Sequence, residues 1–282
     1  EDTLNIDINE IEKHITKKTK AIIPVHYGGQ PCDMDEINNI AKKNNLFVIE
    51  DAAHALPAFY KNKKVGTLSD VTCFSFYVTK CLSTGEGGMI CTDNEEIANR
   101  TSIMRLHGIS KDAWNRYSEN GSWYYEVIAP GYKYNFTDIQ AALGLAQLKK
   151  INEMLDLRKR IYQKYNAAFS KNDFVKIFKI KNDRKSSHHL YPIQIEEEKL
   201  KINRSQFIDE LKKKEIGTSV HFIPLYRHPF YKKTFNLDAK NFPISEKVYP
   251  KLVSLPIWPG MKESQIQKVI DSVFSILNKN KK

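Results

Sequence analysis

Residues 46–54 read Leu-Phe-Val-Ile-Glu-Asp-Ala-Ala-His, and this stretch decides the fold. The apolar run that ends at Glu50 predicts a buried strand of a parallel sheet. A helix is predicted just before it, because Asp33 and Glu36 have capping-box spacing ahead of an apolar helical pattern. Residues 20–26 predict the preceding strand. Alternating strands and helices of this kind indicate an α/β fold with a mostly parallel sheet.

The same alternation continues to about residue 150 and then changes. Further strands are expected at residues 71–76 and 88–92, and Asn94 is expected to cap a helix. Helical spacing from Thr137 to Phe169 predicts one long helix that bridges two domains. The elements expected beyond it are strands near 174–178, 190–195 and 218–222 and helices near 205–214 and 263–278. We therefore expect a large α/β domain over residues 1–150 and a smaller α+β domain over residues 151–282.

The composition indicates a folded protein with an uneven charge. The 282 residues are 41% apolar and 11% aromatic, which excludes a disordered chain. The net charge is +11, and the residues from Ile151 onward contribute 27 basic against 14 acidic side chains. The lysines are scattered singly, without interleaved aromatics, so a solvated basic surface is expected and no nucleic-acid groove.

Cysteine and hydropathy patterns narrow the class of protein further. The four cysteines form no Cys-x-x-Cys pair and have no histidine at zinc-finger spacing, so we expect no metal site and no disulfide framework. Reduced thiols are typical of a cytoplasmic protein. No apolar stretch approaches the roughly 18 residues of a membrane span, which predicts no membrane association.

Two side chains follow predicted strands in places suited to chemistry. Asp51 comes directly after a strand, where ligands of open α/β sheets gather, although capping of the next helix is the more common role of an acidic residue there. Lys80 follows the strand at residues 71–76 and precedes Gly85-Glu-Gly-Gly88. A lysine held among apolar groups can become a nucleophile that forms a Schiff base. Most lysines are only solvated surface charges. Ser75 can offer a hydroxyl to a phosphate.

These motifs together resemble a known family. The sequences Glu50-Asp51-Ala-Ala-His54, Ser75-Phe-x-x-x-Lys80, Gly85-Glu-Gly-Gly88 and Asn135-Phe-Thr-Asp138 are similar to those of the DegT/DnrJ/EryC1/StrS sugar aminotransferases. The resemblance implies pyridoxal 5'-phosphate (PLP) as the cofactor and the type I fold of aspartate aminotransferase. Within the family, Asp112-Ala-Trp114 and residues 130–135 resemble enzymes that aminate C4 of UDP-linked 4-keto sugars.

The resemblance also implies roles for single residues. Lys80 is expected to hold the cofactor and to move protons, and Asp51 to pair with its pyridinium nitrogen. His54 is expected beside the phenolic oxygen, with an ordinary loop histidine as the alternative. Ser75 is expected at the cofactor phosphate, and Asn135 is expected to reach that phosphate from a neighbouring subunit. A shared site implies a homodimer.

Other polar and aromatic residues permit two interpretations each. His221 is expected either to face the sugar-nucleotide pocket, as the resemblance implies, or to be packed beside Phe222. Four tyrosines are either a stacking surface or core residues. They are Tyr124, Tyr125, Tyr132 and Tyr134.

The predicted reaction moves an amino group from an amino acid, expected to be L-glutamate, to a keto sugar nucleotide. Relatives carry a leading segment with a Gly-Thr-x-Ala-Leu turn that this sequence lacks, so the 282 residues are expected to be a fragment of a longer enzyme. A PLP-dependent sugar dehydratase is an alternative, but Lys80 stands where such dehydratases have histidine. A non-catalytic or regulatory protein on the same fold is a second alternative.

Overall fold

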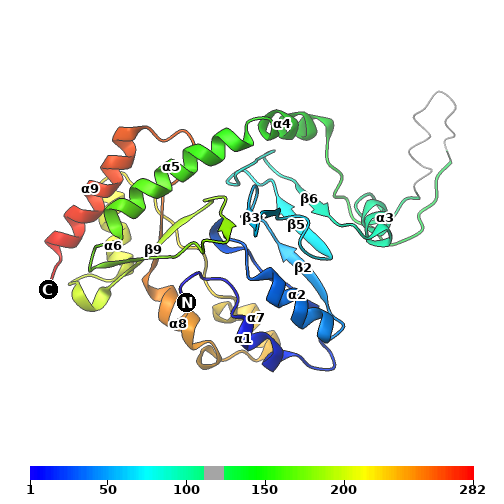
Figure 1. Cartoon of the computed structure of the whole chain (residues 1–282), viewed down its shortest axis with the longest axis horizontal. Helices are drawn as coiled ribbons and strands as arrows, with labels where there is room; N and C mark the ends of the chain where they lie inside the picture. Colours follow the sequence, from blue (N-terminus) through cyan, green and yellow to red (C-terminus); the bar gives the residue numbers. More distant parts are fainter. Residues whose placement is uncertain (111–123) are drawn as a thin grey trace.

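A computed structural model of the chain describes residues 1–110 and 124–282. Its central sheet has the strand order β1-β2-β5-β6, in which the first three strands are parallel and β6 is antiparallel to β5 (Figure 1). These strands are β1 (Ala21–Ile22), β2 (Phe47–Asp51), β5 (Val71–Ser75) and β6 (Gly88–Cys91). The described α/β sheet confirms the fold class expected for the first half.

Three helices accompany this sheet: α1 (Ile8–Ile11), α2 (Met34–Lys43) and α3 (Glu95–Met104). Helix α2 buries Met34, Ile37 and Ala41 in a core that also contains Val48 of β2. This spacing is the inward stripe that the sequence predicts. Asn94 caps α3 as expected, because its side chain accepts a hydrogen bond from the amide of Ile97 at 3.1 Å.

The second half packs around an antiparallel sheet in which β9 (Tyr191–Ile195) lies between β7 (Val175–Ile177) and β10 (Leu252–Leu255). All five residues of β9 are buried. The largest apolar core surrounds this strand and joins α5 (Ile151–Phe169), α6 (Arg204–Lys213) and α9 (Glu263–Lys279). Figure 1 shows α5 running alongside α9 and toward the central sheet.

The remaining elements are short. Besides several short 3₁₀ turns, the described chain has a small antiparallel sheet of order β4-β3-β8 and three further α-helices. They are β3 (Phe59–Tyr60), β4 (Lys63–Lys64), β8 (Arg184–Lys185), α4 (Asp138–Leu148), α7 (Pro229–Phe235) and α8 (Pro243–Val248). In the two described ranges, no helix combines the length and the apolar character that a bilayer span requires.

The expected single helix from Thr137 to Phe169 is wrong. The chain forms α4 and α5 with a break at Lys150, whose backbone angles of φ −104° and ψ 1° are not helical. Thr137 begins α4 with the predicted capping box. The apolar residues do not form one buried stripe, because Ile139 is 84% exposed whereas Ile161 is 2% exposed. The two segments therefore face different surroundings and need not be collinear.

Three other expectations about local structure are also wrong. The strand expected at residues 20–26 ends at Ile22, since Pro24 has no amide hydrogen for a ladder bond. Residues 218–222 form only a single bridge between Ser219 and Ser254, and the chain then leaves the sheet. The Asp33 carboxylate does not cap α2 and instead binds Lys181 and Arg184.

Candidate functional site

The carboxyl ends of β1, β2 and β5 lie along one edge of the central sheet, because these strands are parallel. Asp51 ends β2 and pairs in register with Cys73 of β5. Ser75 ends β5 two residues later, and the following turn carries Lys80. This edge is where open α/β sheets bind ligands. The fold therefore brings Asp51, Ser75 and Lys80 to one side of the sheet.

Asp51 is held by its backbone and by one side-chain bond. Its amide donates to the carbonyl of Pro24 at 2.9 Å, and its carbonyl accepts from the amide of His26 at 3.0 Å. Oδ1 accepts the amide of Ala53 at 3.0 Å. No helix follows, so this bond closes a turn and the helix-cap interpretation is wrong. The backbone bonds fix the carboxylate at the carboxyl edge.

The Lys80 amine is half-buried in a turn in which its amide donates to the carbonyl of Tyr77 at 2.9 Å. Burial lowers the pKa of this amine, while the charge of Asp51 acts in the opposite direction. The charge of Lys80 in turn contributes to the lowered pKa of His54 and of His221. Lys80 thus lies within electrostatic reach of all three side chains.

His54 forms one wall of this site and is 7% exposed. Its Nδ1 accepts a hydrogen bond from the amide of Gly28 at 3.3 Å, and Tyr27 meets the ring edge-on with centroids 6.3 Å apart. The ring of Phe222 is stacked at 5.9 Å. Burial, with smaller effects from the charges of Lys80 and His221, lowers the pKa of His54 to about 3. His54 is therefore a neutral imidazole.

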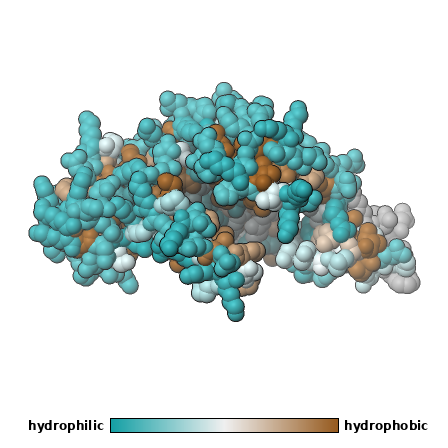
Figure 2. Space-filling model, turned by 90° about the horizontal axis from the view of Figure 1, so that it is seen from below, coloured by the Kyte–Doolittle hydropathy of each residue, from teal (hydrophilic) through white to brown (hydrophobic). Residues whose placement is uncertain are grey.

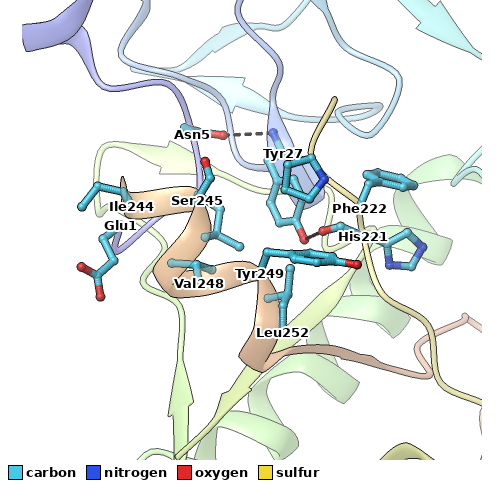
Figure 3. Close-up of a pocket in the computed structure, with 12 residues that line it drawn as sticks. Glu1, Asn5, Tyr27, His221, Phe222, Ile244, Ser245, Val248, Tyr249 and Leu252 are labelled. Carbon is cyan, nitrogen blue, oxygen red and sulfur yellow. Dashed lines mark hydrogen bonds between the residues drawn. The ribbon is translucent and has the colours of Figure 1, made fainter. Parts of the chain in front are cut away.

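His221 is half-buried, and its ring meets the ring of Phe222 edge-on with centroids 4.8 Å apart. Its Nδ1 lies 2.8 Å from Oγ of Ser254, and its carbonyl accepts a hydrogen bond from the Tyr27 hydroxyl at 2.5 Å. Figure 3 shows this bond beside a cavity of about 190 Å³ that Tyr27, His221 and Tyr249 help to line. The cavity lies between the N-terminal residues and α8. Tyr27 thus contacts the His54 ring and also lines this cavity.

The glycine-rich segment at residues 85–88 packs closely against neighbouring side chains. Gly87 has φ 143°, and a Cβ placed there would come within 2.3 Å of Cε2 of Phe136. Thr84 Oγ1 donates to the carbonyl of Glu86 at 2.7 Å. Ser75 Oγ accepts the amide of Tyr77 at 3.3 Å, which leaves its own hydrogen free to donate. The need for glycine at position 87 therefore comes from packing on Phe136.

Asn135 lines a hollow of about 780 Å³ beside β6, together with Met89, Phe136 and other residues, and Lys80 is not among the residues that line it. The tyrosines expected either in the core or on a stacking surface are exposed, from 47% at Tyr125 to 72% at Tyr134, so the core interpretation is wrong. Tyr132 and Tyr134 stack on each other with centroids 5.0 Å apart.

A buried polar network behind Asp51 was missed by reasoning from the sequence. Nε2 of His26 donates to Oε2 of Glu50 at 2.7 Å, and both residues are fully buried. The hydroxyls of Ser69 and Thr72 donate to Oε1 of Glu50 at 2.7 and 2.8 Å. Glu50 precedes Asp51, so the two carboxylates point to opposite faces of the sheet. The sequence signal that could have predicted this network is Glu50 itself, a charged residue at the end of an apolar run.

Comparisons with known proteins identify the family of the chain. The DegT/DnrJ/EryC1/StrS aminotransferase family matches residues 1–274. An uncharacterised protein of Methanocaldococcus jannaschii is 56% identical over 99% of this chain and 72% of its own length. The spore coat polysaccharide biosynthesis protein SpsC of Bacillus subtilis is 48% identical over 98% of this chain and 72% of its own length.

A solved structure gives the same result for the fold. The PMP form of the sugar aminotransferase Spr1654 from Streptococcus pneumoniae has a TM-score of 0.89 and 32% identity, over 99% of this chain and 74% of that one. A PLP form of the same protein also matches. The fold is thus that of PLP-dependent sugar aminotransferases. This chain belongs to the DegT/DnrJ/EryC1/StrS aminotransferase family and is a PLP-dependent aminotransferase.

Proposed function

We propose that the enzyme transfers the amino group of L-glutamate to C4 of a UDP-linked 4-keto hexose. The observation that carries the proposal is the placement of Lys80 within electrostatic reach of Asp51 at the carboxyl edge of the sheet. The role of SpsC in polysaccharide biosynthesis supports a sugar substrate. The motif at residues 130–135 supports the C4 position. The related motif at Asp112–Trp114 lies outside the described residues.

The residues at this edge fit the cofactor. Asp51 offers an anion to a protonated ring nitrogen, and Ser75 offers a hydroxyl to a phosphate. Bound PLP supplies an electron sink for the charge left when a proton leaves the substrate carbon. Lys80 would hold the cofactor covalently, and its Nζ atom would move that proton after the amino donor has taken its place on the cofactor. Burial lowers the pKa of Lys80 and so favours the neutral amine that this transfer needs.

We assign two histidines to the bound molecules, His54 to the cofactor and His221 to the sugar. His54 is neutral, so its Nε2 can donate a hydrogen bond to the phenolic oxygen of the cofactor. Two observations support the assignment of His221 to the sugar: the charge of Lys80 reaches His221, and its Nδ1 lies 2.8 Å from Oγ of Ser254. The excess of basic residues after Ile151 favours the approach of a diphosphate.

A substrate panel tests the reaction. We expect the full-length enzyme with L-glutamate to convert a UDP-4-keto hexose into the 4-amino sugar and to release 2-oxoglutarate, both measured by mass spectrometry. A UDP-3-keto hexose and the dTDP-linked 4-keto sugar serve as matched controls, expected to react at least about tenfold more slowly. Faster amination of either control would contradict the proposed substrate. Loss of a sugar hydroxyl without gain of nitrogen would indicate the dehydratase reaction.

We further propose a homodimer in which Asn135 of each subunit completes the neighbour's phosphate site. Apolar side chains are exposed along α4 and β6, with Leu145 63% exposed and Met89 51% exposed. Figure 2, which draws the molecule from below, shows a mostly hydrophilic surface with apolar patches. Patches of this kind commonly mark interfaces between proteins. Asn135 lies beside this surface, in a hollow that Met89 also lines and Lys80 of the same chain does not.

Subunit complementation tests the shared site. Lys80→Ala and Asn135→Ala variants are each expected to be nearly inactive, whereas their co-expression should restore about a quarter of the wild-type activity. Half of the dimers are then hybrids, and one of the two sites in each hybrid is intact. Co-expression of Lys80→Ala with Ser75→Ala is the control. Lys80 and Ser75 of one site come from the same subunit, so every site of a hybrid dimer lacks one of the two residues. Equal recovery in the two pairs would contradict the proposal.

A further inference from the structure

His189 lies against the proposed site but has no role so far. It belongs to the segment between β8 and β9 and is 7% exposed. Its ring lies on the ring of His54, with centroids 4.5 Å apart and planes 35° from parallel. Its Nδ1 lies 3.8 Å from Sγ of Cys81, the neighbour of Lys80. More than 130 residues of sequence thus separate two imidazoles that are in contact.

A closed set of interactions joins the two histidines through Gly28. The amide of His189 donates to the carbonyl of Gly28 at 3.1 Å, and the amide of Gly28 donates to Nδ1 of His54 at 3.3 Å. The Ser187 hydroxyl donates to the carbonyl of His54 at 2.5 Å. A Cβ at Gly29 would lie 2.0 Å from Oγ of Ser187, so only glycine permits this approach.

This arrangement determines which nitrogen of His54 carries the proton. Since Nδ1 accepts the amide hydrogen of Gly28, the neutral ring is protonated at Nε2. The ring stays neutral because burial, followed by the charges of Lys80 and His221, lowers its pKa to about 3. Burial, followed by the charges of His54, Arg158, Lys80 and His221, lowers the pKa of His189 to about 2. Among the described residues, no hydrogen bond to Nε2 of His54 is present.

We propose that His189 is a positioning residue which, by stacking on His54 and binding Gly28, keeps His54 oriented as an Nε2–H donor to an oxygen of the bound cofactor. The proposal rests on the site proposed around Lys80. The stack is worth about 0.5–1.5 kcal/mol, which is roughly twofold to tenfold in an equilibrium. Its loss loosens the His54 ring, because the hydrogen bond from Gly28 and the more distant rings of Tyr27 and Phe222 then remain as the restraints.

The next residue provides a matched control. His188 is also a buried histidine of the same segment, but its ring contacts Tyr162 with centroids 4.6 Å apart. Burial and the charges of Lys159 and Arg158 lower its pKa to about 4, and Lys80 is not among the causes. A change that reflects only damage to this segment should therefore follow equally from replacing His188.

The test uses full-length holoenzyme variants His189→Ala, His189→Phe and His188→Ala, with folding checked by thermal melting. We expect His189→Ala to weaken PLP binding by about threefold to tenfold. It should also move the pH midpoint of the cofactor's visible absorbance upward, because an oxygen without its donor holds a proton more tightly. His189→Phe keeps the stack and should restore both values. His188→Ala should leave both unchanged.

Two outcomes would overturn the proposal: a wild-type midpoint in His189→Ala, or an equal shift in His188→Ala. In a His54→Phe background, His189→Ala should cause no additional shift, and an additional shift of the same size would show that His189 acts without His54. A failure of the proposed site itself is distinguishable, because the visible absorbance would then persist in Lys80→Ala.

Discussion

Replacing Lys80 with alanine is expected to remove the visible absorbance of bound PLP and to lower kcat by about 10⁴-fold or more. In the proposed site this amine both holds the cofactor covalently and moves the proton of the reacting carbon. The structure supports the assignment, because burial lowers the pKa of Lys80 and Asp51 is its charged neighbour. Absorbance spectra of purified holoenzyme and single-turnover rates with L-glutamate measure the two effects separately.

The control variants distinguish the loss of the nucleophilic amine of Lys80 from the loss of its positive charge. Lys80→Arg keeps a positive charge beside Asp51, but a guanidinium stays protonated and does not bond to an aldehyde carbon, so this variant should be as inactive as Lys80→Ala. Lys64→Ala, in the exposed strand β4, should match the wild type. A visible band of normal intensity in Lys80→Ala would remove Lys80 from its proposed role.

The large-scale features of the site follow from local sequence patterns. The apolar run before Asp51 and the strand before Lys80 are predicted by composition and length alone. Parallel pairing of β2 and β5 then brings both side chains to one edge without further information. The assigned roles still depend on the family resemblance. The division at residue 150 stays a prediction.

The contacts around the site, such as that between His54 and His189, could not be predicted from local sequence patterns. His189 occupies a segment without periodicity, and its contact with His54 depends on the close approach of Gly29 to Ser187. The bonds of Glu50 depend on residues from β5 and from the loop after β1. Such contacts are set by tertiary packing between distant segments, which local propensity does not encode. The break between α4 and α5 is a similar case, since exposure differs on its two sides.

The substitution Asp51→Asn is expected to lower kcat by about 10²- to 10³-fold while PLP binding weakens less than tenfold. Asparagine has the same shape and can still accept the amide of Ala53 through Oδ1, so the turn should persist. What disappears is the negative charge that keeps the pyridinium nitrogen protonated and the cofactor an effective electron sink. The change therefore acts on rate more than on affinity.

The loss of this charge has a second measurable consequence. The charge of Asp51 raises the pKa of Lys80 against the effect of burial, so its removal should lower the pKa of that amine. Because the reaction needs the neutral amine, the acidic limb of the pH–rate profile should move to lower pH. Asp70→Asn is the matched control, because Asp70 accepts the amide of Val48 at 2.8 Å next to the start of β5, at the opposite edge of the sheet. It should change neither kcat by more than about twofold nor the profile. If Asp51→Asn retained wild-type kcat, or if Asp70→Asn lost as much, the carboxylate at position 51 would have no special relation to the cofactor ring.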